Sequence, residues 1–188
     1  ICVVMTFLSP YFLTAQNIRT MVLSFAINGI VIIGMTIVMV NGGIDLSVGS
    51  VMAVIGAIAG SLYQADMNVW LAALIALLFA AFIGAFNGFF ITKVGLSPFI
   101  TTLAMLGIAR GGAFVVTKGI PLSLYDMPDS FKAIGKGGIG GVPYVIIIFI
   151  VFVAVADFLM RRSTFLRRAF YTGSNEQAAI FSGVNVNR

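Results

Sequence analysis

The stretch NGGIDLSVGS, residues 41–50, places a carboxylate in a chain that is otherwise strongly apolar. A carboxylate at the centre of a bilayer costs about 2.5–3.5 kcal/mol on insertion scales, so Asp45 must reach water or face a polar site lined by protein. Gly42 and Gly43 permit a sharp break in the backbone. The side-chain oxygen of Asp45 or Ser47 can then cap the amides of a following helix. Two interpretations stay open for Asp45 and Ser47: a capped turn between helices, or groups that line or gate a transport route.

Two more polar side chains fall within apolar stretches. Asn87 either makes hydrogen bonds between helices or lines the transport route. Arg110 follows Ser97 by 13 residues. That separation corresponds to about 20 Å along a helix, which places Arg110 in the outer half of the membrane. Its side chain either extends to the outer interface or faces the route.

The sequence gives little support to catalytic or metal chemistry. The chain contains no histidine, which is the commonest general base and a frequent metal ligand. Aspartyl chemistry requires two carboxylates close together. The acids other than Asp45 fall in expected outer loops or at and beyond the inner interface: Asp66, Asp126, Asp129, Asp157 and Glu176. We therefore expect no catalytic residue, no metal and no cofactor, and an intramembrane enzyme is the less favoured rival.

The composition is that of a membrane protein. Hydrophobic residues make up 60% of the chain, charged residues only 9%, and the mean hydropathy is +1.10, whereas soluble domains carry about 25% charged residues. About 20 apolar residues cross a bilayer. Five candidate spans and the end of a sixth have this character: 1–12, 21–40, 48–63, 69–92, 97–117 and 142–160. We expect an all-α polytopic bundle of about six transmembrane segments.

Some of these segments are incomplete. The segment 48–63 is short, so it is expected to cross only partly or to begin inside the membrane. The first segment starts at Ile1, already inside an apolar run, so the chain is expected to be a fragment whose N-terminus lies upstream. Residues 1–160 would form the transmembrane domain and residues 161–188 a cytoplasmic loop.

The arginine cluster RRSTFLRR, residues 161–168, directly follows the last apolar run. Because Lys and Arg are enriched in cytoplasmic loops, we expect residues 161–188 in the cytoplasm. Alternating the spans backward then puts the turn at 41–50 on the inner side and the loop 118–141 on the outer side. Four basic residues still fall outside: Arg19, Lys118, Lys132 and Lys136.

The C-terminal segment has the pattern of one short helix. Ser174 and Gln177 form a capping box, and Gly183 can supply a left-handed stop. The helix would be about 12 Å long, too short to span, and would lie across the cytoplasmic surface. Either it is an ordinary amphipathic loop helix or it docks to a partner. The residues assigned to it are Ser174, Asn175, Glu176, Gln177, Ala178, Ala179, Phe181 and Gly183.

Three strings resemble one known family. They are GMTIVMVNGGIDLSVGSVMAVIGAIAG at 34–60, NGFFITKVGLSPFITTLAMLGIARG at 87–111 and GSNEQAAIFSGVNV at 173–186. Together they are similar to permease subunits of bacterial ATP-binding-cassette importers for ribose and related monosaccharides. Family members are roughly twice as long, so the chain resembles their N-terminal half and the following cytoplasmic loop.

The resemblance implies a function and a set of partners. It implies a multi-pass subunit of the bacterial inner membrane that moves a simple sugar inward by alternating access, with no reaction of its own. An ATPase subunit would dock on the C-terminal segment, here the coupling helix. A solute-binding protein would deliver substrate, and a second permease subunit and membrane lipid would complete the assembly, with no nucleic acid. Another solute, such as an amino acid, a nucleoside or an autoinducer-type sugar derivative, stays an alternative.

Overall fold

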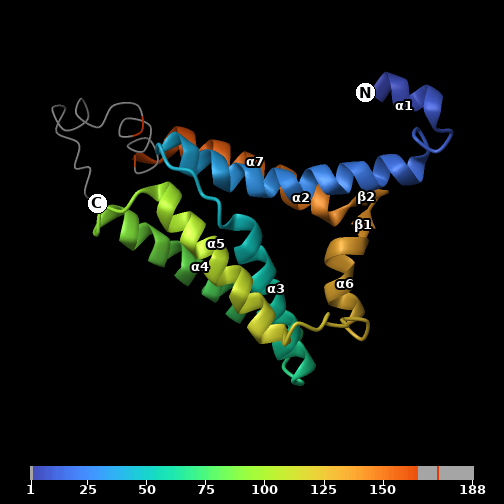
Figure 1. Ribbon diagram of the computed structural model, residues 1–188. Coiled ribbons are helices and arrows are strands. Elements are labelled where there is room, and N and C mark those ends of the chain that lie inside the picture. Colours follow the sequence, from blue (N-terminus) through green and yellow to red (C-terminus); the bar gives the residue numbers. More distant parts are fainter. Residues whose placement is uncertain (1, 165–172, 174–188) are drawn as a thin grey trace.

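The computed structural model describes residues 2–164 and residue 173, and this part of the chain is almost entirely helical (Figure 1). Its one sheet is a two-residue antiparallel ladder. The elements in chain order are α1 (Cys2–Leu8), α2 (Ala15–Val40), α3 (Val48–Gln64), α4 (Val69–Thr92), α5 (Pro98–Thr117), α6 (Asp129–Lys136), β1 (Gly138–Ile139), β2 (Val142–Pro143) and α7 (Tyr144–Arg162). The predicted all-α polytopic class is confirmed.

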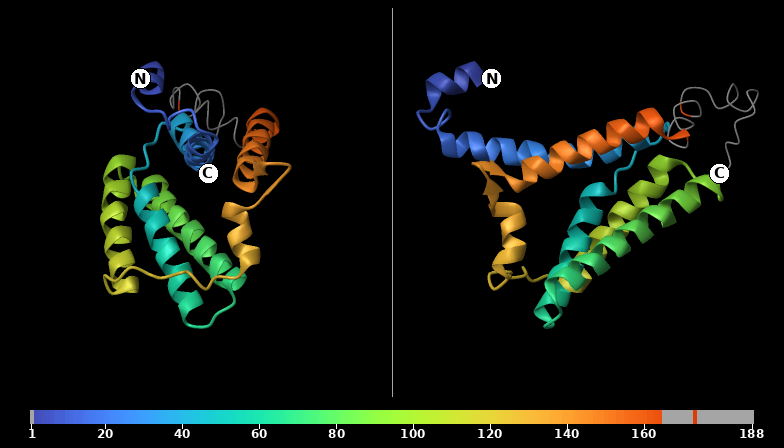
Figure 2. Two further views of the ribbon diagram at one scale, coloured as in Figure 1. Left: turned by 90° about the vertical axis from the view of Figure 1, so that its right-hand side faces the viewer. Right: turned by 180° about the vertical axis from the view of Figure 1, so that it is seen from behind.

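The long helices form two packed groups, which Figures 1 and 2 show from three sides. Helix α3 packs against α4 and α5, and α2 runs beside α7. The centre of the first group is an apolar cluster of Val54, Ile83, Met105 and Ala109. The groups are joined by the segment between α2 and α3 and by the long connection from α5 to α7.

Four of the described helices are long and apolar enough to cross a membrane: α2, α4, α5 and α7. Helix α3 has 17 residues, a length of about 26 Å, which is less than a bilayer core of about 30 Å. This agrees with the expectation that the second full segment is short. Helix α1 has only seven residues, all exposed.

Helix α2 begins earlier than the apolar pattern predicted. It starts at Ala15 instead of residue 21, because the hydroxyl of Thr14 accepts a hydrogen bond from the Asn17 amide at 3.3 Å and caps the helix. Polar residues therefore form the first turns. Helix α7 starts later than predicted, at Tyr144, because the two preceding residues pair with β1.

The loop 118–141 contains structure that the sequence analysis did not anticipate. Helix α6 and the β1–β2 hairpin lie within it. The Tyr63 hydroxyl donates to the Asp126 carbonyl at 2.7 Å, and the Gln64 amide donates to the Ser123 carbonyl at 2.9 Å. The connection is thereby tied to the end of α3 that lies far from the α2–α3 link.

The α2–α7 contact depends on one glycine. A Cβ at Gly29 would overlap the ring of Phe149 on α7, whereas a Cβ at Gly34 on the same helix would meet nothing within 4 Å. Small residues allow transmembrane helices to approach closely. Gly29 is therefore the position at which the aromatic ring fits against α2.

Replacing Gly29 with valine should lower the free energy of unfolding of the full-length protein by about 1–3 kcal/mol, the usual cost of overpacking. Equilibrium unfolding in mixed micelles would measure the change. Gly34→Val introduces the same side chain on the same helix and should have a smaller effect. Equal destabilisation by the two variants would show that helix propensity, not the Phe149 contact, decides the outcome.

Candidate functional site

Helix α2 ends in a well-defined stop just before the carboxylate of interest. The Gly42 amide donates to the Met39 carbonyl at 2.9 Å, and the Gly43 amide donates to the Val38 carbonyl at 3.1 Å. Gly42 has φ +81°. This is the Schellman arrangement, in which a glycine takes the left-handed conformation just past the helix. The glycines thus provide the backbone break that the sequence indicated.

The carboxylate of Asp45 organises the start of α3. Its Oδ1 accepts hydrogen bonds from the Ser47 amide at 2.8 Å and from the Ser47 hydroxyl at 2.6 Å. Ser47 occupies the N-cap position of α3, but its side chain makes no bond to a helix amide. Of the two candidate capping oxygens, it is the one on Asp45 that binds a backbone amide. The Ser47 hydroxyl is held by Asp45 instead.

A third predicted residue joins this pair from another helix. The Nδ2 of Asn87 on α4 donates to the Ser47 Oγ at 3.4 Å, although the two residues are 40 positions apart. Ser47 is 1% exposed and Asn87 5% exposed. Asp45, Ser47 and Asn87 therefore form one hydrogen-bonded row that crosses from the α2–α3 link into the α3–α4 interface.

Helix α5 contributes to the same end of the bundle. The Thr102 hydroxyl lies 3.2 Å from the carbonyl oxygen of Ile44 and 2.8 Å from that of Pro98. In the described part of the chain, the buried polar side chains are Ser47, Asn87, Thr101 and Thr102. The sequence analysis missed the two threonines, although two adjacent hydroxyls early in an apolar span are a usable signal.

One acceptor in the cluster has no donor. The Oδ1 of Asn87 is buried and has no hydrogen-bond partner among the described residues. An unpaired buried acceptor costs about 1–3 kcal/mol. This oxygen is therefore chemically suited to accept a hydrogen bond from water or from a hydroxyl group of a solute.

Arg110 lies apart from this cluster. It is eight residues beyond Thr102 on α5, about 12 Å along the helix. Its exposed side chain lines a groove between α3 and α5 whose other walls include Ala53, Ala57 and Phe114. The structure therefore brings together three of the four predicted pathway residues and leaves the fourth at a separate place.

The remaining carboxylates do not join Asp45. Asp157 pairs with Arg161, with 2.8 Å between Oδ1 and Nε, and Asp129 lies 3.7 Å from Lys132. Within residues 2–164 and 173, no group of three or more His, Cys, Asp or Glu could hold a metal ion. The residues assigned to the coupling helix lie outside the described residues: Ser174, Asn175, Glu176, Gln177, Ala178, Ala179, Phe181 and Gly183.

Long apolar helices around a small buried polar cluster define a multi-pass helical membrane protein. The chain belongs to the permease family described as "branched-chain amino acid transport system / permease component", whose sequence pattern matches residues 17–188. The resemblance seen in the three sequence strings is thus confirmed.

Several relatives are import permeases for sugars. The chain is 34% identical over 187 residues to the ribose import permease protein RbsC of Haemophilus influenzae, which covers 98% of this chain and 58% of that protein. It is 38% identical over 184 residues to RbsC of Escherichia coli K12, and the match covers 96% of this chain and 57% of that protein. It is 40% identical over 153 residues to the fructose import permease protein FruF of Bifidobacterium longum, and the match covers 80% of this chain and 43% of that protein. The chain spans less than two thirds of the length of these relatives, and no solved structure matches it.

Proposed function

We propose that the full-length protein is the transmembrane permease subunit of an ATP-binding-cassette importer, and that it moves a simple sugar inward across the bacterial cytoplasmic membrane. The observation that carries this proposal is similarity to ribose import permeases along 96–98% of the chain. The similarity to a fructose import permease agrees with it. The subunit itself breaks no covalent bond in this proposal, and ATP is hydrolysed on a partner.

The proposal assigns gating of the route to Asp45, Ser47 and Asn87. Their hydrogen bonds link the α2–α3 break to α4, and a glycine stop precedes them. Alternating access requires elements with two arrangements whose balance a partner can shift. Broken helices that carry polar groups are where transporters commonly place such sites. A hydrogen-bonded break between packed helices is suited to that role. Arg110 would line the route farther from this break.

The proposed assembly contains three kinds of partner protein. A separate ATPase would dock on the segment containing Glu176 and Ala179, and a solute-binding protein would deliver the sugar from outside. A second permease subunit, identical or different, would complete the path. These partners follow from the importer class, and residues 161–188 would lie in the cytoplasm because of the arginine cluster at 161–168.

Uptake by the full-length protein tests the proposal directly. The host cells lack their own sugar importers and express this permease together with the ATPase and the solute-binding protein encoded beside it. We expect these cells to accumulate labelled ribose or fructose. Omitting the ATPase should abolish the accumulation. Labelled leucine serves as the competing substrate, because the family description names branched-chain amino acids. Uptake of leucine without any sugar uptake would contradict the sugar assignment.

A further inference from the structure

Three of the four basic residues expected on the outer side converge at one place in the fold. The guanidinium of Arg19, near the start of α2, donates a hydrogen bond to the backbone carbonyl of Lys136 at 3.4 Å, although the residues are 117 positions apart. Lys132 lies one turn before Lys136 on α6. Lys118 stays separate, at the end of α5. Bringing like charges together is unfavourable unless an opposite charge accompanies them.

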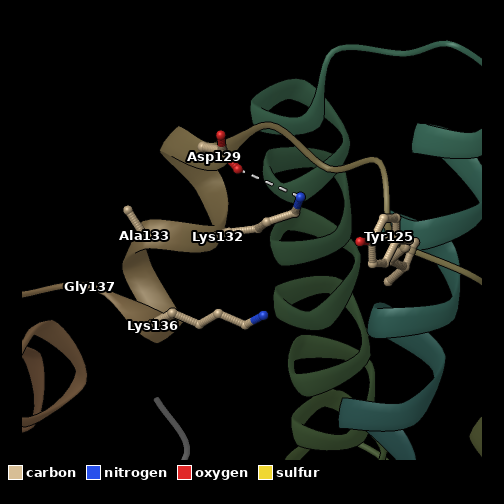
Figure 3. A pocket seen from close by; sticks show the side chains of 7 residues that line it. Tyr125, Asp129, Lys132, Ala133, Lys136 and Gly137 are labelled. Carbon is tan, nitrogen blue, oxygen red and sulfur yellow. Dashed lines mark ion pairs between the residues drawn. The ribbon is translucent and has the colours of Figure 1, made fainter.

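The two lysines line a common hollow, shown in Figure 3. Both side chains extend from the same side of α6, toward the side on which Tyr125 lies. The Nζ of Lys132 lies 5.8 Å from the centroid of the Tyr125 ring. The hollow therefore presents two ammonium groups and one phenol to the same space.

Among the described residues that line the hollow, one carboxylate offsets these charges. Asp129 also lines the hollow, and its Oδ1 lies 3.7 Å from the Lys132 Nζ. The Asp129 side chain is fully exposed, so water screens much of its charge. Two lysines against one aspartate leave the lining of the hollow with a net charge of +1, and the guanidinium of Arg19 lies near the Lys136 end of α6. An anion is the ligand that such a site favours.

The surroundings of α6 resemble a membrane interface. Asp129, Lys132 and Lys136 share one face at helical spacing, and the apolar Phe131 and Ile134 lie on the opposite face. Phe131 makes an edge-to-face contact with Trp70, with ring centroids 5.3 Å apart. Trp70 is the second residue of the membrane span α4 and is half exposed. Tryptophan and tyrosine are enriched where membrane spans meet the headgroup layer.

We propose that the hollow beside α6 binds the phosphate of an anionic phospholipid headgroup, with Lys132 and Lys136 as the charge-bearing contacts and Tyr125 as a hydroxyl donor. A phosphate oxygen accepts hydrogen bonds from ammonium and phenol groups. The apolar face of α6 and Trp70 would lie against the acyl region while the lysines remain at headgroup depth. The site is separate from Asp45 and does not depend on sugar import.

Lipid titration of the purified full-length protein tests the site without any transport measurement. In detergent solution, native mass spectrometry would count bound phosphatidylglycerol and phosphatidylcholine. We expect the parent protein to prefer phosphatidylglycerol over phosphatidylcholine. This preference should fall about fivefold in Lys132→Gln and about fivefold in Lys136→Gln, each compared with the parent. Lys118→Gln removes the same charge from another part of the outer side and should change the preference less than twofold. Lys132→Arg and Lys136→Arg should retain it.

Each other outcome overturns the assignment. Equal effects of the Lys118 and α6 variants would show that binding follows net charge alone. Stabilisation of the protein by inorganic phosphate, without preference between the two lipids, would assign the hollow to a soluble anion. Unchanged lipid preference with lost binding of the solute-binding protein would make it a protein contact. Because sugar uptake is not the readout, failure here leaves the proposed transport function intact.

Discussion

Replacing Asp45 with asparagine in the full-length permease should lower sugar uptake about tenfold or more, while the amount of protein in the membrane stays normal. Asparagine has nearly the same shape, and its oxygen can still accept hydrogen bonds from the amide and hydroxyl of Ser47, which lie 2.8 and 2.6 Å from Oδ1. Only the negative charge is lost. A hydrogen bond to a charged group is about twice as strong as one between neutral groups. The substitution should therefore weaken the two hydrogen bonds that hold Ser47 at the start of α3.

Two variants make this experiment specific. Asp66→Asn removes the same charge near the opposite end of α3, where the positive φ of +61° suits asparagine, and it should leave uptake unchanged. Ser47→Ala removes the hydroxyl that connects Asp45 to Asn87 and should reduce uptake without altering charge. Normal uptake by Asp45→Asn at matched expression would reduce Asp45 to a local cap of the helix.

The second large effect is expected in the cytoplasmic segment. Replacing Ala179 with arginine in the full-length permease should lower ATPase recruitment to membranes, and with it sugar uptake, by about tenfold or more, the scale of losing an interface hot spot. The sequence of this segment predicts a capping box at Ser174 and Gln177 and a small apolar face. A long charged side chain on that face adds bulk and a desolvation cost to docking.

A matched arginine controls for charge alone. Asn187→Arg places the same side chain on the same tail, beyond the stop predicted at Gly183, and should leave recruitment unchanged. Recruitment would be measured as ATPase co-sedimenting with membranes at equal permease levels. Parental recruitment and uptake with Ala179→Arg would mean that the ATPase docks elsewhere, and the importer proposal would lose its coupling element.

The sequence alone determined the class of the fold and most of the helices. A membrane span requires about 20 apolar residues in succession, so a run such as 69–92 can be recognised from the sequence alone. Helix α4 has the same bounds. The break before α3 was also predictable, because glycines and an aspartate adjacent in the chain act on their own backbone. The coupling role of the C-terminal segment stays a prediction.

Only the tertiary structure decided which distant residues meet. Nothing local in the sequence places Asn87 beside Ser47, the Thr102 hydroxyl beside the Ile44 carbonyl, or Arg19 at the end of α6. Helix α6 was also missed, since eight residues with little hydrophobicity give a weak signal and are held by contacts such as Phe131 with Trp70. Hydropathy and capping report on neighbours within a few turns. The meeting of side chains 40 to 117 positions apart depends on how whole helices pack, which is set by shape complementarity across their surfaces.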